Sequence, residues 1–184
     1  MILPGENSLK RLIEESEIRE KVSALGEQIA HDYRDHPLTV LGVLTGSIVL
    51  LSDLIRKINL PLRVGLIQAS SYRGGAVTAG DLSINSELLP DITNRDVLLV
   101  DDIFDSGHTI ATLIETVRKK NPQSVRSAVL LKKQKQSVVE IEPDYYCFEI
   151  PNVFVVGYGL DYNDEYRHLP YIAVLEDEDL AVEA

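Results

Sequence analysis

The sequence is poor in the features that mark membrane, secreted and disulfide-bonded proteins. It has a single cysteine, Cys147, among 184 residues, so no internal disulfide can form and we expect a reducing compartment. No stretch approaches the roughly 18 consecutive apolar residues that a membrane-spanning helix needs. The first residues lack the basic and then apolar pattern of a signal peptide. We therefore expect a cytoplasmic protein with no membrane partner.

Basic residues are scarce relative to acidic ones. Lys and Arg number 18 against 29 Asp and Glu, which gives a formal net charge of −11. Part of this charge lies in residues 176–184, an acidic segment without a base that we expect to be solvated and frayed. Nucleic-acid binding depends on Lys and Arg that neutralise phosphates, so the charge argues against nucleic acid as the main partner. A phosphorylated ligand would need local compensation from backbone amides, a few placed cations or Mg²⁺.

The rest of the composition is that of an ordinary globular protein, and the length suits one domain over residues 1–184. Helical and strand patterns alternate along the chain, which predicts an α/β fold with a doubly wound, mainly parallel sheet flanked by helices. The expected helices are 15–33, 48–58 and 109–120, and the expected strands are 39–44, 62–70, 81–89, 97–100, 125–131, 145–149, 153–156 and 172–175. In the second of these helices, we expect Ile48, Leu51, Ile55 and Ile58 to face inward.

The most informative stretch is residues 97–110, with the sequence VLLVDDIFDSGHTI. Four apolar residues predict a buried parallel strand that ends at Asp101 and Asp102, and residues 105–109 make the turn into a helix. Ligands of open α/β sheets bind beyond the carboxyl ends of the strands. The amides of the turn and the helix N-terminus favour an anion, whereas the paired acids favour hydroxyls or a divalent cation. A phosphorylated sugar with a diol, such as phosphoribosyl diphosphate with Mg²⁺, satisfies both.

Two further segments have the composition of ligand-binding loops. Thr45, Gly46 and Ser47 lie between a strand and a helix, where they form either a second anion-binding turn or a plain turn with Ser47 as helix N-cap. Residues 70–80 are long for a connection and contain three glycines. They fit a disordered hairpin loop at rest, which is compatible with a lid that closes over bound substrate.

These motifs resemble the signature of the purine phosphoribosyltransferases, in particular the hypoxanthine-guanine branch of the type I family. The resemblance covers residues 41–175 and implies the type I fold, with a small hood built from the terminal segments. It also implies transfer of the phosphoribosyl group from phosphoribosyl diphosphate to hypoxanthine or guanine with Mg²⁺, in a homo-oligomer that is a dimer or a tetramer. The family often has Lys or Arg where this chain has Thr45, so that cation is absent here.

The resemblance assigns roles to individual residues of this chain. Asp101 and Asp102 would hold the ribose hydroxyls and metal, Asp161 would bind a second Mg²⁺, and Asp105 would take the proton of the purine N7 or hydrogen-bond to it. The remaining implied substrate contacts are Ser106, Gly107, His108 and Thr109 for the 5′-phosphate, Thr45, Gly46, Ser71, Tyr72 and Arg167 for diphosphate, and Lys133, Phe154 and Val155 for the base.

Simpler interpretations of some of these residues stay open at the level of sequence. Asp105 could cap the following helix, and Phe154 could pack in the core. For the residue that donates to the 6-oxo group of the base, Lys133 is the better match, counted back from the downstream motif, and Lys132 is the runner-up. The two rival functions are a transferase for another base, such as xanthine, adenine or orotate, and a non-catalytic RNA-binding regulator with the same fold. The net charge of −11 disfavours the regulator.

Overall fold

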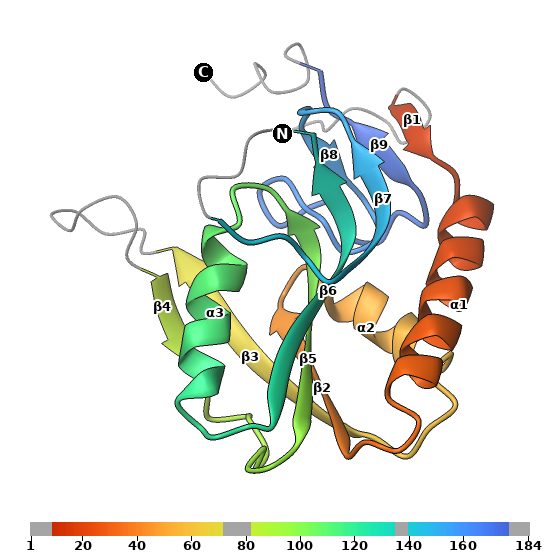
Figure 1. The fold of residues 1–184 in the computed structure, drawn as a ribbon. Coiled ribbons are helices and arrows are strands. Elements are labelled where there is room, and N and C mark those ends of the chain that lie inside the picture. The colour runs from red at the N-terminus through yellow and green to blue at the C-terminus, as the bar shows by residue number, and fades with distance from the viewer. Residues whose placement is uncertain (1–8, 72–81, 135–139, 177–184) are drawn as a thin grey trace, which may run out of the picture.

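The structure is a computed structural model that describes residues 9–71, 82–134 and 140–176 (Figure 1). Its centre is a six-stranded sheet in which neighbouring strands are parallel, except for one antiparallel pair at an edge of the sheet. In spatial order the strands are β4 (Leu82–Asn85), β3 (Arg63–Ser71), β2 (Leu38–Leu44), β5 (Asp96–Phe104), β6 (Ser124–Lys133) and β7 (Tyr145–Ile150).

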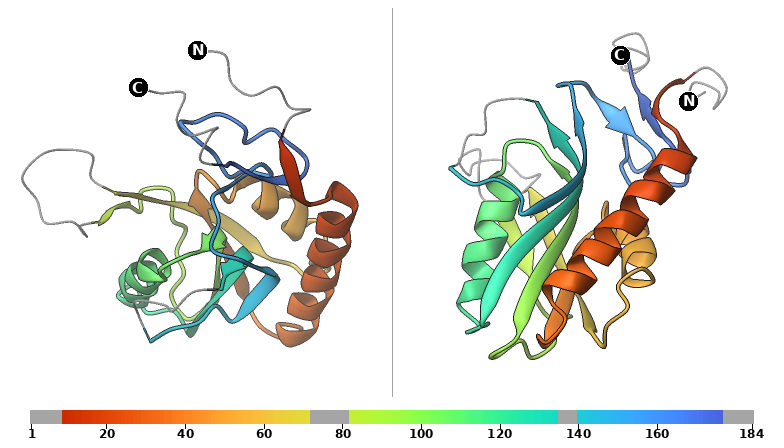
Figure 2. Two further views of the ribbon diagram at one scale, coloured as in Figure 1. Left: turned by 90° about the horizontal axis from the view of Figure 1, so that it is seen from above. Right: turned by 45° about the vertical axis from the view of Figure 1, so that its right-hand side comes forward.

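Helices cover both faces of this sheet. α1 (Glu15–Asp32) and α2 (Ile48–Ile55) lie on one face, and α3 (His108–Arg118) lies on the other (Figures 1 and 2). Each face has its own apolar layer, so Leu98 and Val100 of β5 pack toward α1 and α2, whereas Val97 and Leu99 pack toward α3. The arrangement confirms the predicted doubly wound, mainly parallel α/β fold.

A separate three-stranded sheet stands above the strand ends of the main sheet (Figure 2). It consists of β1 (Lys10–Ile13), β9 (Ile172–Val174) and β8 (Val155–Val156) in that order, and both pairs are antiparallel. This sheet brings segments from near both ends of the chain together and confirms the expected hood. Strand β1 was not predicted, because four residues with two adjacent cations carry no readable alternation.

The two strands nearest the candidate site are longer than the sequence indicated. We expected β5 to stop at Val100, but its ladder with β6 continues through the pair of Asp101 with Val129 to the pair of Phe104 with Lys132. β6 likewise runs to Lys133 instead of Leu131. The predicted ends were wrong because charged side chains do not interrupt backbone pairing. Asp101, Asp102 and both lysines therefore stand on strands, whereas Asp105 lies in the turn after β5.

The inward face of α2 also differs from the prediction. Leu51 and Ile58 are buried as predicted, although the helix ends at Ile55 instead of residue 58. Ile48 is 47% exposed, and Leu50 and Leu54 are buried instead. The sequence of this helix is apolar around most of its circumference, so helical periodicity could not identify the buried side.

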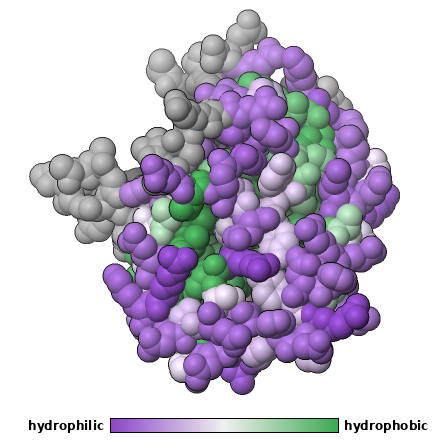
Figure 3. Space-filling view, in the orientation of Figure 1, coloured by the Kyte–Doolittle hydropathy of each residue, from purple (hydrophilic) through white to green (hydrophobic). Residues whose placement is uncertain are grey.

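The surface in the view of Figure 3 is mostly hydrophilic, with hydrophobic residues reaching it beside α3 and near the small sheet. Among the described residues, no helix is both long enough and apolar enough to cross a lipid bilayer.

Cys147 lies buried on β7, and this burial raises the pKa of its thiol to about 12. At about pH 8 roughly one such thiol in 10⁴ is ionised, and the thiolate is the reactive form. We expect iodoacetamide to leave Cys147 unlabelled in the folded protein and to label it after unfolding in denaturant, as measured by mass spectrometry. Rapid labelling of the folded protein would contradict this packing.

Candidate active site

The candidate site forms where three neighbouring parallel strands end. β2, β5 and β6 are adjacent in the sheet, so the turn after β2, the acids of β5 and the lysines of β6 meet at one edge. Two cavities of about 330 Å³ and about 190 Å³ lie there. Both are lined by Asp102, Ile103 and Asp105. The strand order thus explains why residues far apart in the sequence share one site.

Asp101, which is buried, and Asp102, which is half-buried, are adjacent acids near the carboxyl end of β5. The Asp101 side chain accepts a hydrogen bond of 3.0 Å from the Asp102 amide, and Asp102 Oδ1 accepts one of 2.7 Å from the Ile103 amide. Burial raises the pKa of both carboxyls, and repulsion from Asp102 raises that of Asp101 further. Hydroxyl donors or a divalent cation beside the pair would lower the free-energy cost of ionising the two carboxyls.

The turn after β2 packs directly against this acid pair. A Cβ on Gly46 would stand 1.6 Å from Asp102 Oδ2, so a larger residue there would displace Asp102 or the turn. Gly159, with a φ of 103°, lies on the other side of the turn, and a Cβ on it would stand 2.1 Å from the Gly46 carbonyl oxygen. Ser47 occupies the N-cap position of α2, but its hydroxyl donates 2.6 Å to the Val43 carbonyl instead of capping the helix. The peptide bond between Leu44 and Thr45 is cis.

The turn after β5 lines the larger cavity. Gly107, at a φ of 80°, is the N-cap of α3, which begins at His108. Ser106, Gly107 and Thr109 line the cavity, whereas the His108 side chain is exposed. Because the N-cap is Gly107, the alternative that Asp105 caps this helix is wrong. The amides and the helix N-terminus form a cradle suited to a phosphate.

Lys133 and Asp105 approach each other in the smaller cavity, where Lys133 Nζ lies 3.6 Å from Asp105 Oδ2. Lys132 points the other way, because alternate residues of a strand face opposite sides, and pairs with Glu142 at 2.7 Å. Of these two lysines, Lys133 therefore faces Asp105, the first residue after β5. This geometry favours Lys133, the better match in the sequence, over the runner-up Lys132.

Phe154 forms one wall of the smaller cavity and is 43% exposed, so it is not a core residue. Its ring stands edge-to-face against Tyr162, with centroids 5.7 Å apart and planes at 85°. Val155 of β8 lines the same cavity, and Leu160 lines it from the loop after β8. An exposed ring over a small cavity is a stacking platform for a flat heterocycle. The contact of Tyr162 with the Phe154 ring was not predicted, although Tyr162 lies eight residues after Phe154 in the same motif.

Arg167 lines neither of the two cavities and is held by acids and by the backbone of the Gly159 loop. Its guanidinium donates 2.8 Å to the Gly159 carbonyl and contacts Asp161 Oδ1 at 2.9 Å and Asp164 Oδ1 at 3.1 Å. Arg167 also lowers the pKa of Asp102, although burial dominates the net upward shift. Its planar, multidentate group suits a diphosphate.

Three of the expected contacts that the structure describes, His108, Arg167 and Thr45, line neither of the two cavities. Thr45 is exposed. Ser71 is the last residue of β3, and nothing in the structure describes its side chain. Tyr72 and the rest of the expected lid lie outside the described residues.

The acids of the site do not form a complete cage for a metal. Across residues 9–71, 82–134 and 140–176, no group of three or more His, Cys, Asp or Glu side chains gathers to hold an ion. Asp101 and Asp102 nevertheless offer carboxylate oxygens at the larger cavity, and Asp161 offers one at the smaller. Mg²⁺ usually takes one or two carboxylates and completes its shell with water and substrate phosphates, so this donor set fits it.

Comparisons with known proteins agree with this geometry. The family model described as "Phosphoribosyl transferase domain" matches residues 9–163, and the chain belongs to this family. The chain is 42% identical over 174 residues to the hypoxanthine-guanine phosphoribosyltransferase of Streptococcus pneumoniae R6, covering 94% of this chain and 97% of that protein. It is 43% identical over 168 residues to the enzyme of that name from Dictyostelium discoideum, covering 89% and 93%.

A solved structure shows the same fold. The crystal structure of a hypoxanthine phosphoribosyltransferase from Staphylococcus aureus superposes with a TM-score of 0.87 at 38% identity, covering 94% of each chain. The resemblance stated from the sequence motifs is confirmed by these matches.

Proposed function

We propose that this chain is a purine-salvage enzyme that transfers the 5-phosphoribosyl group from phosphoribosyl diphosphate to hypoxanthine or guanine, giving IMP or GMP and diphosphate. The observation that carries the proposal is the pair of cavities that share Asp102 and Asp105. The larger has acids and an amide cradle for a phosphorylated sugar. The smaller has a cation and an exposed ring for an oxopurine. The names of the relatives support the same reaction.

The residues of the site divide the work of this reaction. Asp101 and Asp102 accept hydrogen bonds from the ribose hydroxyls, and the turn at 105–109 binds the 5′-phosphate. Phe154 stacks on the base, and Lys133 donates to its 6-oxo group. As the bond from ribose C1′ to diphosphate breaks and the bond to the purine nitrogen forms, Asp105 accepts the proton of the base or its hydrogen bond at N7. Most of the rate enhancement comes from holding the two substrates in line.

We propose Mg²⁺ as the cofactor, held by Asp101 and Asp102 with the sugar and by Asp161 near the diphosphate. When bound, the ion neutralises charge that builds on the departing diphosphate. Arg167 and the amide of Gly46 complete the diphosphate site from the protein side. These groups supply positive charge to a chain whose formal net charge is −11.

A panel of bases tests the proposed reaction. The purified protein is incubated with phosphoribosyl diphosphate, Mg²⁺ and hypoxanthine, guanine, xanthine, adenine or orotate, and nucleotide formation is followed by chromatography. We expect turnover with hypoxanthine or guanine. Turnover with another base alone would refute the specificity, and no turnover with any base would refute the enzymatic function.

Replacing Lys133 by Met is expected to raise the KM for hypoxanthine by about tenfold or more, because a hydrogen bond from a charged group contributes roughly 1.5–3 kcal/mol. Lys132→Met is the matched control, since the neighbouring lysine pairs with Glu142 on the other side of the strand. Steady-state kinetics at saturating phosphoribosyl diphosphate measures both variants. A larger effect in Lys132→Met would reverse the assignment.

We also propose that the enzyme is a cytoplasmic homo-oligomer. The exposed Ile48 on α2 gives an apolar group for a subunit contact. In a solved relative, the hypoxanthine phosphoribosyl transferase of Trypanosoma cruzi, the C-terminal region has a role in the oligomeric state of that protein. The single cysteine fits a reducing compartment. Light scattering after size-exclusion chromatography measures the mass in solution, and a monomer at every concentration would contradict the assembly.

A further inference from the structure

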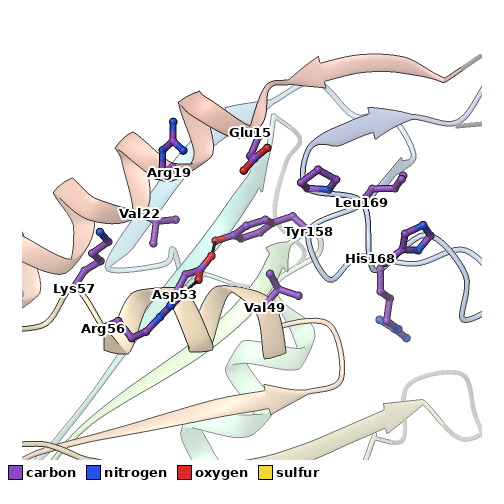
Figure 4. A pocket seen from close by; sticks show the side chains of 12 residues that line it. Glu15, Arg19, Val22, Val49, Asp53, Arg56, Lys57, Tyr158, His168 and Leu169 are labelled. Carbon is purple, nitrogen blue, oxygen red and sulfur yellow. Dashed lines mark hydrogen bonds and ion pairs between the residues drawn. The ribbon is translucent and has the colours of Figure 1, made fainter. Parts of the chain in front are cut away.

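A hydrogen bond outside the two substrate cavities joins α2 to the loop that follows β8. The Tyr158 hydroxyl donates 2.7 Å to Asp53 Oδ2, and Arg56 also contacts Asp53. The three side chains line a third cavity of about 440 Å³ that opens between α1, α2 and the loop at residues 167–170. Figure 4 shows the Tyr158 ring crossing this cavity to reach Asp53. Nothing in the proposed reaction uses this pair directly.

Tyr158 lies in a backbone segment that needs support from its surroundings. Its own φ is 49°, and the flanking Gly157 and Gly159 have φ values of 99° and 103°. A non-glycine residue in the left-handed region is unfavourable and persists where other contacts fix it. The Tyr158 amide donates 2.8 Å to the Leu169 carbonyl, and the hydroxyl at the far end of the side chain is fixed by Asp53. The loop is thus fastened at both its backbone and its side chain.

The residue after Tyr158 touches two parts of the diphosphate site. The Gly159 amide donates 3.0 Å to the Arg167 carbonyl, and the Gly159 carbonyl accepts 2.8 Å from the Arg167 guanidinium. Gly159 also packs so closely on Gly46 that a Cβ would stand 2.1 Å from the Gly46 oxygen. A shift of Gly159 would therefore displace both Arg167 and the turn after β2.

Asp53 belongs to the helix that the same turn begins. The Ile48 amide donates 3.2 Å to the Thr45 carbonyl, and Asp53 follows in the second turn of α2. The turn after β2, helix α2, Tyr158 and Gly159 are therefore connected in a closed series of contacts. The hydrogen bond from Tyr158 to Asp53 completes this series. This closed series fixes the position of Gly159 and Arg167 relative to the turn after β2, and these are the two sides of the proposed diphosphate site.

We propose that Asp53 and Tyr158 are positioning residues for the diphosphate group of phosphoribosyl diphosphate. They contact no substrate, and they act by holding Gly159, and through it Arg167 and Gly46, in the arrangement that receives the diphosphate. The inference rests on the proposed function, because it takes this turn and Arg167 as the diphosphate site. It assigns no role to the pair in recognition of the base.

The test replaces Tyr158 by Phe, which keeps the ring in its buried place and removes only the hydroxyl. We expect the KM for phosphoribosyl diphosphate to rise by about tenfold, since a hydrogen bond to a charged group is lost and tenfold corresponds to about 1.4 kcal/mol. The KM for hypoxanthine is expected to change by less than about twofold. Asp53→Asn should reproduce this pattern, and the double variant should be no worse than the more affected single variant.

The chain offers a matched control for the loss of a tyrosine hydroxyl. Tyr145 on β7 also donates to a carboxylate, at 2.9 Å to Asp32 Oδ2, and lies buried away from both substrate cavities. Tyr145→Phe is expected to lower the melting temperature without changing either KM by more than about twofold. This control separates loss of stability from loss of positioning.

Three outcomes would overturn the inference while the wild-type enzyme remains active. They are an unchanged KM for phosphoribosyl diphosphate in both Tyr158→Phe and Asp53→Asn, equal rises in the KM values of both substrates, and a Tyr145→Phe variant with the same kinetic defect. If Tyr158→Phe does not fold, Asp53→Asn alone decides by the same two KM values. A wild-type protein without transferase activity would instead refute the proposed function.

Discussion

Replacing Asp105 by Asn is expected to lower kcat by about 10²- to 10⁴-fold, which is the usual contribution of a positioned general base. Asn has nearly the same shape but cannot take a proton from the base, and it forms no ion pair with Lys133. The carboxylate lies where the two cavities join, so it can reach both the sugar and the purine. The measurement is kcat at saturating concentrations of both substrates.

Binding of the donor serves as the control for this variant. The phosphate amides and the two acids of β5 are untouched, so calorimetry should give a dissociation constant for phosphoribosyl diphosphate with Mg²⁺ within about threefold of the wild-type value. Unchanged kcat in Asp105→Asn would remove its assigned role. Loss of donor binding with the same loss of rate would instead make Asp105 a binding residue.

Replacing Gly46 by Ala is expected to reduce kcat/KM for phosphoribosyl diphosphate by about 100-fold or more, because a misplacement of about 1 Å in a catalytic site can cost that much. The new methyl group would stand 1.6 Å from Asp102 Oδ2, and the opposite side of the turn is closed by Gly159. Either Asp102 or the whole turn must move. Steady-state kinetics with varied phosphoribosyl diphosphate measures the effect.

Gly42→Ala is the matched control, four residues earlier in β2. Its Cβ would stand 2.5 Å from Leu51 Cδ2, the end of a flexible core side chain, and would not meet the acids. We expect it to cost stability, by about 1–3 kcal/mol for an overpacked core, and to leave kcat/KM within about threefold. If Gly46→Ala retained wild-type kinetics, the close packing of the turn on Asp102 would have no functional meaning.

The sequence was sufficient where the local pattern and the global fold agree. The apolar run at 97–100, the two acids and the small-residue turn after it predicted both the central strand and the candidate site, because ligand sites in such sheets follow the strand ends. The alternation of strands and helices predicted the doubly wound sheet. The sequence predicted two strands of the hood, at 153–156 and 172–175, but their assembly into a hood followed from the family resemblance, and β1 carried no pattern of its own.

The sequence was insufficient where long-range contacts decide the geometry. The sequence favoured Lys133 over Lys132 only by its spacing from the downstream motif. Which lysine faces the site depends on how far β6 extends, and its pairing with β5 determines that. Ile48 was placed inward because α2 is apolar on nearly every side. The packing of Gly46 against Asp102 and Gly159 joins three segments that only the folded chain brings together. Each of these features depends on contacts between residues distant in sequence.

The most direct test of the account is a crystal structure of this protein with phosphoribosyl diphosphate and Mg²⁺ and without a base. The account predicts that the ribose hydroxyls contact Asp101 and Asp102, that the 5′-phosphate lies on the amides of residues 106–109, and that the metal lies between the sugar and these acids. A donor molecule bound elsewhere, with the two acids facing only solvent, would contradict it.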